Sequence, residues 1–392
     1  MQDTSAIRPF VYLDAAATTP VRPEVRAAMD PFLSDELFGN PSSTHWAGRM
    51  ARQALDGARR RIGEALDADP SGVVFTSGGT EADNLAILGS AVRPGAGAGR
   101  AAIPATEHKA VLDAARELER LGGEALDLPV HSDGTVDLAA VGNALEREPA
   151  VLSVMWVNNE TGVVQPVERL AEMARDAGVP FHTDGVQAVG KVPCSLDRGS
   201  ISMLSISGHK IGAPKGIGAL ILRQEVSVAP RLHGGGQQRG VRPGTENVAG
   251  AIGLATAVEL AIAERGAFGR DVTRLREELE RRVLAAVPDS QVVGASATRA
   301  PHVSNIAFAH AAAGTLLAAL DLGGIACSAG SACASGSPAA SHVLTAMRVP
   351  NDFLGGAVRF SLSLRSSMED VDRLLAVLPE AVDRARTARG AA

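Results

Sequence analysis

The chain has 392 residues, of which 45% are hydrophobic and 21% are charged, a composition typical of a globular protein and not of a disordered one. Its formal net charge of -6 argues against a surface dedicated to nucleic acid, and no apolar run reaches the roughly 18 residues that a membrane helix needs. Because there are only three cysteines and the first ten residues lack an apolar signal core, we expect a cytoplasmic protein with no nucleic-acid or membrane partner.

Residues 72–223 alternate short apolar runs with segments of helical periodicity. Strands separated by helices need crossover connections, which predicts a mostly parallel sheet covered by helices on both faces. Sheets of this kind bind ligands beyond the carboxyl ends of their strands. The tract 92–99, rich in Gly, Ala and Pro, is expected to be a surface loop. Strands are predicted at 73–76, 101–104, 151–157, 179–183, 202–206 and 217–222, and helices at 107–121 and 167–177.

The pattern of the chain changes after about residue 247. A long helical stretch at 247–265 leads to a second one, whose apolar positions from Val272 to Val283 share one face. Short strands at 302–308 and 357–362 follow, with helices between and after them. The chain length also favours more than one domain, so we predict a smaller α+β domain in this part.

Five successive apolar runs end in polar residues whose chemistry is complementary. Taken singly, each polar cluster is accounted for as a turn, a helix cap or a surface side chain. Taken together, the clusters can bind a phosphate, a pyridine ring and an aldehyde, which are the groups of pyridoxal phosphate. In chain order they are the turn 76–81 with Gly79 and Thr80, then His108, Asn159, the pair Asp184 and Gln187, and Lys210.

Each residue type suits one part of that cofactor. A lysine at a strand end, such as Lys210, can condense with an aldehyde when its amine is activated. The Asp184 carboxylate can hold a protonated pyridine nitrogen, and His108 can stack on the ring and move protons near neutral pH. Glycines at 78–79 let backbone N–H groups approach one phosphate closely, and Asn159 can bond a phenolic oxygen.

With these residues and their surrounding motifs, the chain resembles, almost end to end, the cysteine desulfurases of the NifS/IscS group, which are fold-type I pyridoxal-phosphate enzymes of the class-V aminotransferase family. The motifs that carry the resemblance are residues 13–20 (LDAAATTP), 38–43 (FGNPSS), 106–111 (TEHKAV), 158–162 (NNETG), 207–210 (SGHK), 233–236 (HGGG) and 242–245 (RPGT). It implies an α/β fold in which residues 16–255 form a large domain around a mostly parallel seven-stranded sheet. Residues 1–15 and 256–392 would form a smaller α+β domain that carries the catalytic cysteine segment, at about 325–340.

The resemblance also implies a role for each site residue. Lys210 would hold pyridoxal 5'-phosphate as a Schiff base, Asp184 would pair with its pyridine nitrogen, and His108 would stack on the ring and act in catalysis. The remaining contacts would come from Gln187 and Asn159 to the ring hydroxyl or substrate, from Gly79, Thr80, Ser207 and His209 to the phosphate, and from Arg359, Asn40 and Asn159 to L-cysteine. Arg359 would take the substrate carboxylate, for which a planar guanidinium is suited. Thr245 would reach the phosphate from a partner subunit, which implies an obligate homodimer.

Cys333 lies in the segment 328–336 (SAGSACASG), where small residues surround it. This composition favours a catalytic cysteine that moves between cofactor and acceptor, and the alternative is a buried structural cysteine. By the resemblance, Cys333 takes the sulfur of L-cysteine as a persulfide, L-alanine leaves, and the sulfur passes to an acceptor protein. That acceptor would serve iron–sulfur cluster assembly, tRNA thiolation or DNA phosphorothioation. The segment resembles the longer-loop class, and not the short-loop class associated with selenocysteine lyase activity, and it departs from the family at Ala329 and Ala334.

Cys327 is predicted to be a strand residue, with a redox or relay role as the minor alternative, and Cys194 is predicted to be structural. No C-x-x-C spacing exists, so no metal site is expected. The chain also departs from the family at Gly185, Gly212 and residues 362–365. Two other functions stay open: another fold-type I enzyme, such as an aminotransferase or a selenocysteine lyase, and a non-catalytic scaffold that organises sulfur-transfer partners.

Overall fold

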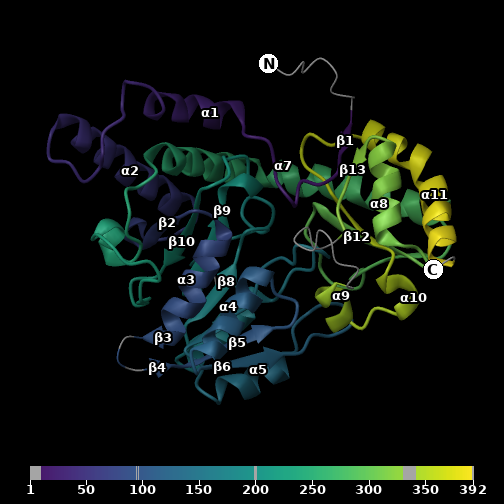
Figure 1. Ribbon diagram of the computed structural model, residues 1–392, viewed down its shortest axis with the longest axis horizontal. Coiled ribbons are helices and arrows are strands. Elements are labelled where there is room, and N and C mark those ends of the chain that lie inside the picture. Colours follow the sequence, from purple (N-terminus) through teal and green to yellow (C-terminus); the bar gives the residue numbers. More distant parts are fainter. Residues whose placement is uncertain (1–9, 94, 96, 198–200, 330–340, 391–392) are drawn as a thin grey trace.

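The computed structural model describes residues 10–93, 95, 97–197, 201–329 and 341–390. A seven-stranded sheet with the order β2-β10-β9-β8-β7-β5-β6 forms its centre (Figure 1). Within this sheet only β10 runs antiparallel to its neighbours, so the carboxyl ends of the other strands lie along one edge. The predicted α/β fold with a mostly parallel sheet is confirmed. The strands are β2 (Val73–Thr76), β5 (Arg100–Pro104), β6 (Glu124–Leu128), β7 (Val151–Ser153), β8 (Phe181–Asp184), β9 (Met203–Ser207) and β10 (Gly218–Leu222).

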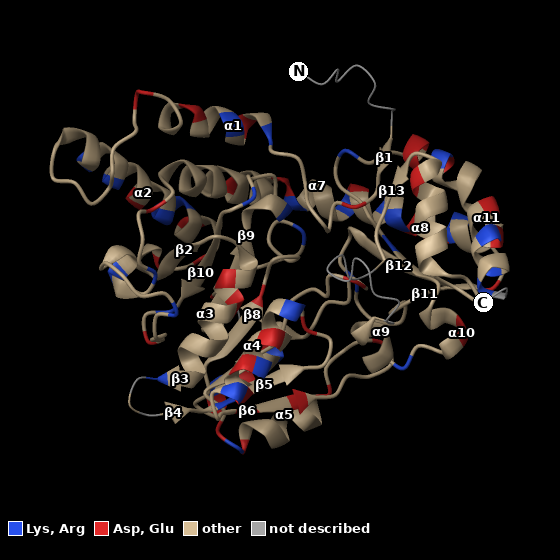
Figure 2. Ribbon diagram, in the orientation of Figure 1, with Lys and Arg blue, Asp and Glu red and all other residues tan. Residues whose placement is uncertain are grey.

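Helices cover both faces of the sheet, because the side chains of each strand alternate between two hydrophobic cores. Along β10, Ala219 and Ile221 belong to one core, whereas Leu220 and Leu222 belong to the other. The first core is covered by α2 (Trp46–Ala65), α5 (Leu138–Leu145), α6 (Val167–Asp176) and the first half of α7 (Val248–Ala286), and the second by α3 (Gly79–Ala91) and α4 (Lys109–Arg120). Charged residues of both signs are mixed along α4 (Figure 2).

The C-terminal part of the chain builds a separate three-stranded antiparallel sheet with its own core, drawn in green and yellow in Figure 1. Phe308 and Phe360 of this sheet are fully buried against Leu279, Leu316 and Leu378 of the surrounding helices. The elements are β11 (Ser290–Val292), β12 (Val303–Phe308), α8 (Ala313–Leu322), α9 (His342–Ala346), α10 (Asn351–Leu354), β14 (Ala357–Ser361) and α11 (Met368–Gly390). The predicted domain limits remain a prediction. The predicted boundary at 255/256 falls inside the continuous helix α7 and not in a linker.

One continuous helix, α7, replaces the two helical stretches predicted after residue 247. Its 39 residues include Gly266 and Gly269, each of which costs a helix about 1 kcal/mol relative to alanine. The helix nevertheless continues, because its two halves are anchored in different cores: Val258 packs under the large sheet and Leu279 under the small one. Packing against both sheets therefore overrides the local preference for a break.

The start of the described chain joins the two parts. Strand β1 (Val11–Tyr12) pairs in parallel with β13 (Ile325–Ala326), and the following residues 14–19 run along the carboxyl edge of the large sheet. The tract 92–99, predicted as a loop, contains the two-stranded ribbon β3 (Val92–Arg93) and β4 (Gly97–Ala98). Short helices complete the described part: α1 (Pro23–Met29) and the 3-10 turns η2 (Asp30–Phe32), η3 (Pro70–Gly72), η5 (Gly208–Lys210) and η6 (Gln237–Gly240). None of the described helices has the length and apolarity needed to cross a membrane.

Candidate active site

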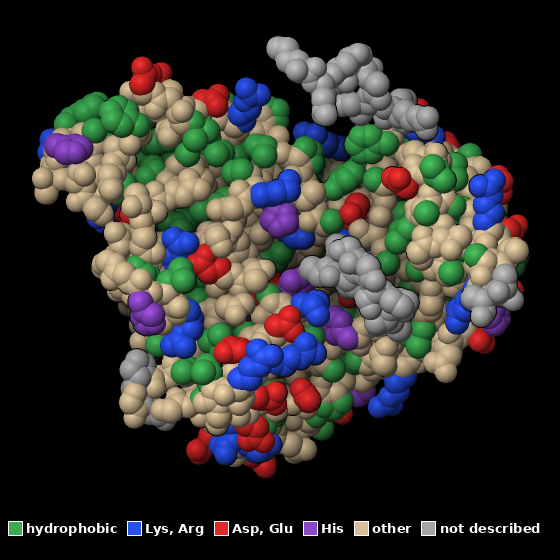
Figure 3. Space-filling model, viewed as in Figure 1, with side chains coloured by type: hydrophobic (Ala, Val, Ile, Leu, Met, Phe, Trp, Pro, Cys, Tyr) green, Lys and Arg blue, Asp and Glu red, His purple; other side chains and the backbone are tan. Residues whose placement is uncertain are grey.

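A cavity of about 300 Å³ lies at the carboxyl edge of the large sheet, a volume at the lower end of the range for small-molecule sites. Side chains from the large sheet and from β14 of the small sheet line it together. Figure 3 shows histidine side chains around the hollow at the centre of this face. The predicted residues that line the cavity are Gly79, Thr80, His108, Asn159, Asp184, Gln187, Ser207, His209, Lys210 and Arg359.

Lys210 reaches the cavity from η5, the single turn that follows β9. The turn is fixed by the backbone, since Gly208 donates its N–H to the Ile217 carbonyl at 3.0 Å. The Lys210 Nζ donates to the Ala16 carbonyl at 2.7 Å and to the Ala17 carbonyl at 2.9 Å. The N-terminal segment thus holds this amine in a defined position at the cavity wall.

Asp184 ends β8, the strand directly beside β9, and is 5% exposed. Its Oδ1 accepts the Val186 N–H at 2.8 Å. Burial raises the pKa of this carboxyl, and the charges of His108 and Lys210 together with the Val186 hydrogen bond act in the opposite direction. A cation that enters the cavity beside Asp184 would further favour the ionised carboxylate, as the nitrogen of a protonated pyridine requires.

His108 caps the N-terminus of α4, where its Nδ1 accepts the Ala110 N–H at 3.1 Å. Burial lowers the pKa of this imidazole below its ordinary value, and Asp184 only partly offsets the effect. The ring is therefore favoured in its neutral form, with the proton on Nε2, because Nδ1 acts as an acceptor. The cap fixes the position of the ring at the cavity wall.

The turn between β2 and α3 has the features of a phosphate site. It opens the 13-residue helix α3, whose first N–H groups are unpaired within the helix and favour an anion. A Cβ atom at position 79 would lie 2.8 Å from Val186 Cγ2, so only glycine permits this close approach of the backbone. Thr80 and Ser207 add hydroxyl groups to the same wall.

His209 lies beside this turn, and its Nδ1 is 3.2 Å from Thr18 Oγ1. Burial, with smaller contributions from the charges of Lys210, Lys215 and Lys191, lowers the pKa of His209 to about 4. The imidazole is therefore a neutral hydrogen-bonding group at neutral pH, not a cation.

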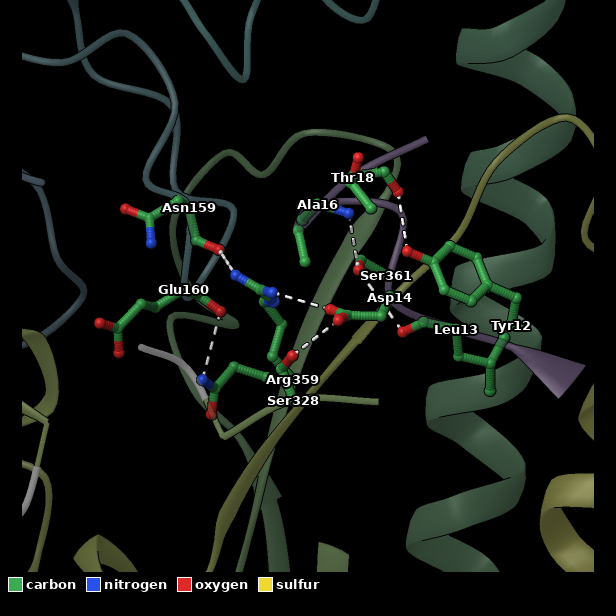
Figure 4. Close-up of polar contacts among 12 residues, drawn as sticks. Tyr12, Leu13, Asp14, Ala16, Thr18, Asn159, Glu160, Ser328, Arg359 and Ser361 are labelled. Atoms are coloured by element: carbon green, nitrogen blue, oxygen red, sulfur yellow. Dashed lines mark hydrogen bonds and ion pairs between the residues drawn. The ribbon is translucent and has the colours of Figure 1, made fainter. Parts of the chain in front are cut away.

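Arg359 extends from β14 into the cavity and is 2% exposed (Figure 4). Its Nη1 donates to the Asn159 carbonyl at 2.9 Å and its Nη2 to Asp14 Oδ1 at 2.8 Å. Asp14 Oδ2 in turn accepts a hydrogen bond from Ser328 Oγ at 2.8 Å. Figure 4 shows the Asn159 side chain directed away from the guanidinium, so this residue holds Arg359 through its backbone alone. Arg359 is a buried, oriented cation suited to a carboxylate.

Three predicted site residues are not among those that line the cavity. Asn40 is exposed, and its Oδ1 accepts the Ser42 N–H at 2.9 Å. Thr245 is exposed as well. Cys333 lies outside the described residues. The roles of all three remain predictions.

The other two cysteines are buried to different degrees. Cys327 directly follows β13 and is not itself a strand residue, because the pairing of β1 with β13 ends at Ala326. Burial, together with the nearby Asp14 carboxylate, raises the pKa of the Cys327 thiol to about 12. A thiol that stays protonated at neutral pH is a poor nucleophile, which disfavours the relay role. Cys194 is buried in the core under the large sheet.

Several cavity residues escaped the sequence prediction. Asp83 stands one helical turn after Gly79, a spacing that could have placed it on the same face of α3. Ala16 and Ala17 contribute backbone carbonyls, which leave no chemical signal in a sequence. His342 follows Ser341, whose Oγ donates to Glu160 Oε2 at 2.5 Å, a contact between distant parts of the chain. The residues missed were Ala16, Ala17, Asp83, Lys109, Met155, Glu160, Val186 and His342.

The described residues fit pyridoxal phosphate. One cavity combines an amine, a buried carboxylate, a neutral histidine and a glycine-lined helix N-terminus. These groups match the aldehyde, the pyridine nitrogen, the ring face and the phosphate of that cofactor, respectively. Because Asp184 and Lys210 stand at the ends of adjacent strands, the two ends of a pyridine ring could be held at once.

The chain is also similar in sequence to known proteins. The sequence model described as "Aminotransferase class-V" matches residues 11–374. A cysteine desulfurase of Cereibacter sphaeroides is 48% identical over 379 residues, which cover 96% of each chain. The cysteine desulfurase IscS of Dictyoglomus turgidum is 42% identical over 377 residues, 96% of this chain and 95% of that one.

Solved structures of NifS-like and related proteins are also similar to this chain. A NifS-like protein superposes with a TM-score of 0.87 at 32% identity, over 96% of this chain and 100% of that one. The structure of SspA in complex with cysteine superposes with a TM-score of 0.79 at 33% identity, over 90% of this chain and 98% of that one.

Proposed function

The chain belongs to the class-V aminotransferase family, and on that premise we propose that it is a cysteine desulfurase that uses pyridoxal 5'-phosphate. One observation carries the proposal: Lys210, Asp184 and Arg359 come from three separate elements and line a single cavity. They supply an amine for covalent attachment of the cofactor, a carboxylate for its pyridine nitrogen and a guanidinium for the carboxylate of an amino-acid substrate. When bound, the cofactor supplies an electron sink for charge that develops on the substrate.

Other cavity residues would contact the ring, the substrate and the phosphate. His108, held by its cap hydrogen bond, would stack on the ring and carry a proton on Nε2. Gln187 and Asn159 would contact the ring hydroxyl or the substrate. Asn40 would also serve the substrate, although it is exposed in the single chain. The phosphate would be held by Gly79, Thr80, Ser207 and His209.

Cys333 would perform the sulfur transfer. Its thiolate attacks Sγ of L-cysteine, so that an S–S bond forms while the Cβ–Sγ bond breaks. The electron pair of the broken bond stays with the carbon fragment, which takes up a proton and leaves as L-alanine. Cys333 retains the sulfur as a persulfide, which then passes to an acceptor thiol. The acceptor would be a protein of iron–sulfur cluster assembly, or one of tRNA thiolation or DNA phosphorothioation, in the cytoplasm.

Incubation of the cofactor-loaded protein with L-cysteine tests this function. With a thiol reductant present, alanine and sulfide should form in equal amounts, because each turnover releases one of each. No keto acid should be needed, which separates desulfuration from transamination. A comparison of L-cysteine with L-selenocysteine separates it from a selenocysteine lyase. Alanine formation that depends on an added keto acid, or a protein that binds no cofactor, would contradict the proposal.

Replacing Arg359 by lysine should raise the KM for L-cysteine by about tenfold or more, because a hydrogen bond to a charged group contributes on the order of 1.5–3 kcal/mol. Lysine keeps the charge but cannot make the planar contacts to the Asn159 carbonyl, to Asp14 and to a substrate carboxylate together. Steady-state kinetics would measure the change, and cofactor affinity should stay unaltered. A normal KM in the R359K variant would remove the carboxylate role.

We also propose a homodimer in which Thr245 completes the phosphate site of the partner. Leu33, Phe38 and Trp46 are 67%, 73% and 62% exposed. They lie close together in the sequence, between η2 and the start of α2, and exposed apolar groups of this size favour a contact with another protein surface. Thr245 is exposed and does not line the cavity of its own chain, as expected of a residue that serves the partner subunit.

Sedimentation should therefore find a dimer. Phe38→Asp should shift the protein toward a monomer and weaken cofactor binding, whereas Leu322→Asp should do neither. Leu322 is 78% exposed on α8 and so provides a matched change at another surface. A fully active wild-type monomer would exclude the dimer proposal.

A further inference from the structure

A buried lysine that has no part in the chemistry above lies next to the cavity. Lys191 is 7% exposed and stands in the turn that follows β8. Lysine is rarely buried without a charged partner. Its Nζ donates instead to a neutral group, the Oε1 of Gln187, at 3.1 Å. Placing an amine here carries a desolvation cost, which suggests that the amine has a role at this position.

The turn brings Lys191 and Gln187 together and holds them rigidly. The Ala188 carbonyl accepts the N–H groups of both Lys191 and Val192, at 3.0 Å each, so the backbone forms a tight turn that carries both Gln187 and Lys191. Gly190 has a φ of +73°, and a Cβ there would lie 2.4 Å from Ala261 Cβ of α7. The turn therefore packs closely against α7, which fixes the backbone that carries Lys191.

Three hydrogen-bond partners fix the orientation of the Gln187 side-chain amide, that is, the side on which its oxygen and its nitrogen lie. The Lys191 Nζ donates to the Gln187 Oε1, so the amide oxygen faces Lys191. His302 Nε2 lies 3.0 Å from the same oxygen. On the other side, the Gln187 Nε2 donates to the Ala16 carbonyl at 2.8 Å, the carbonyl that also accepts from Lys210. One N–H of the amide is thus used on Ala16, and the second N–H is left for a group in the cavity that Gln187 lines.

The protonation of Lys191 and His302 fits these hydrogen bonds to the Gln187 oxygen. Burial lowers the pKa of Lys191 to about 7, and the Lys210 charge adds to the effect. His302 is fully buried and its pKa is well below the ordinary value, through burial and through the charges of Lys191, Arg359, Arg276 and Lys210. His302 is thus neutral, and in this state Nε2 can carry the proton that Gln187 Oε1 accepts.

We propose that Lys191 is a positioning residue for the cofactor: it locks the Gln187 amide with its oxygen turned away from the cavity, so that the site offers an N–H to the phenolic oxygen of the pyridine ring. The inference rests on the proposed cofactor site, and it adds a residue that touches neither cofactor nor substrate. A rotated amide would offer a carbonyl oxygen there, which repels a phenolate and would weaken cofactor binding.

Lys191→Met removes the donor and keeps the volume of the side chain. The variant should bind pyridoxal phosphate about five- to tenfold more weakly, as expected for a misplaced hydrogen bond in a buried site. It should also raise the pH at which the yellow colour of the bound cofactor changes, by about half a unit or more. The sign follows because the variant loses the N–H that the Gln187 amide offers to the phenolate, and this loss favours retention of a proton. Titration of the apoprotein with cofactor and a spectrophotometric pH titration measure the two effects.

Two controls separate positioning through Gln187 from a general effect of the lysine charge. Lys215→Met removes an exposed positive charge near the same site, one that acts on His209, and should leave cofactor affinity unchanged. In a Gln187→Ala background, Lys191→Met should have no further effect on affinity, since the lysine acts through that amide.

An unchanged affinity in the single variant, or an equal loss with and without Gln187, would overturn the proposal. If Lys191→Met does not fold as the apoprotein, Lys191→Leu replaces it, and failure of both variants would show that the lysine only supports the fold. These readouts use no cysteine. A wild-type protein that binds the cofactor but releases no sulfur would therefore refute the proposed function and leave this test intact.

Discussion

Replacing Lys210 by alanine is expected to lower turnover of L-cysteine by at least about a thousandfold, because the amine that attaches the cofactor covalently is lost. The Nζ of Lys210 is held by the Ala16 and Ala17 carbonyls at the cavity wall, and Asp184 stands at the end of the neighbouring strand. Two other amines are near. Lys191 is engaged with Gln187 and does not line the cavity, whereas Lys109 lines the cavity but is an exposed side chain at the start of α4. The K210A variant should still bind the cofactor, since the phosphate turn and Asp184 remain.

Reduction with borohydride followed by mass spectrometry would identify the attached residue directly. Wild-type protein should carry the cofactor on a peptide containing Lys210, and the variant should carry none. Lys215→Ala is the matched control, because Lys215 is exposed and lies on the same loop. Attachment of the cofactor at another lysine, with turnover retained, would refute the assignment.

Replacing Cys333 by alanine is expected to reduce sulfide release in the presence of a reductant by at least about a hundredfold, because the nucleophile that accepts the sulfur is lost. The yellow colour and the affinity for the cofactor should be normal, since the described cofactor site is complete without this residue. A colour change on addition of L-cysteine should also persist, because Arg359 and Lys210 are intact. The variant should therefore bind its substrate and stop before sulfur transfer.

Cys327→Ala is the matched control for that variant. The thiol of Cys327 is partly buried, with a pKa raised to about 12, and so is not a thiolate at neutral pH. The control should release sulfide within about twofold of the wild-type rate, as expected for an unreactive cysteine. Trapping with an alkylating reagent followed by mass spectrometry should find the persulfide on Cys333 alone. A persulfide on Cys327, or full turnover of C333A, would show that Cys333 is not the residue that transfers the sulfur.

Reasoning from the sequence located most of the cavity, because parallel strands present their carboxyl ends along one edge. Asp184 and Lys210 follow two separate apolar runs, and β8 and β9 do pair side by side. The glycine turn before α3 and His108 before α4 are likewise local features, each next to a strand end. Each of these four features depends only on its own strand, turn or cap, and each lies at the cavity.

Contacts between distant segments were beyond that reasoning. Nothing in the spacing of the chain indicates that the Ala16 carbonyl joins Lys210 and Gln187, or that Ser341 bonds to Glu160. Arg359 was assigned by resemblance alone, and its pairing with Asp14 depends on the approach of β14 to the N-terminal segment. Asn40 and Thr245, also assigned by resemblance, stand on the surface of the single chain.

By itself, the sequence determined the α/β fold, the order of the functional strand ends and the chemical identity of the groups that they carry. These follow from hydrophobic periodicity and from turn and cap residues, whose effects act over a few neighbouring positions. Only the tertiary structure decided that α7 is unbroken, that Cys327 is partly buried with a raised pKa and that Lys191 contacts Gln187. Those properties arise from burial and from contacts between segments that pack together in the folded chain, and no local pattern encodes them.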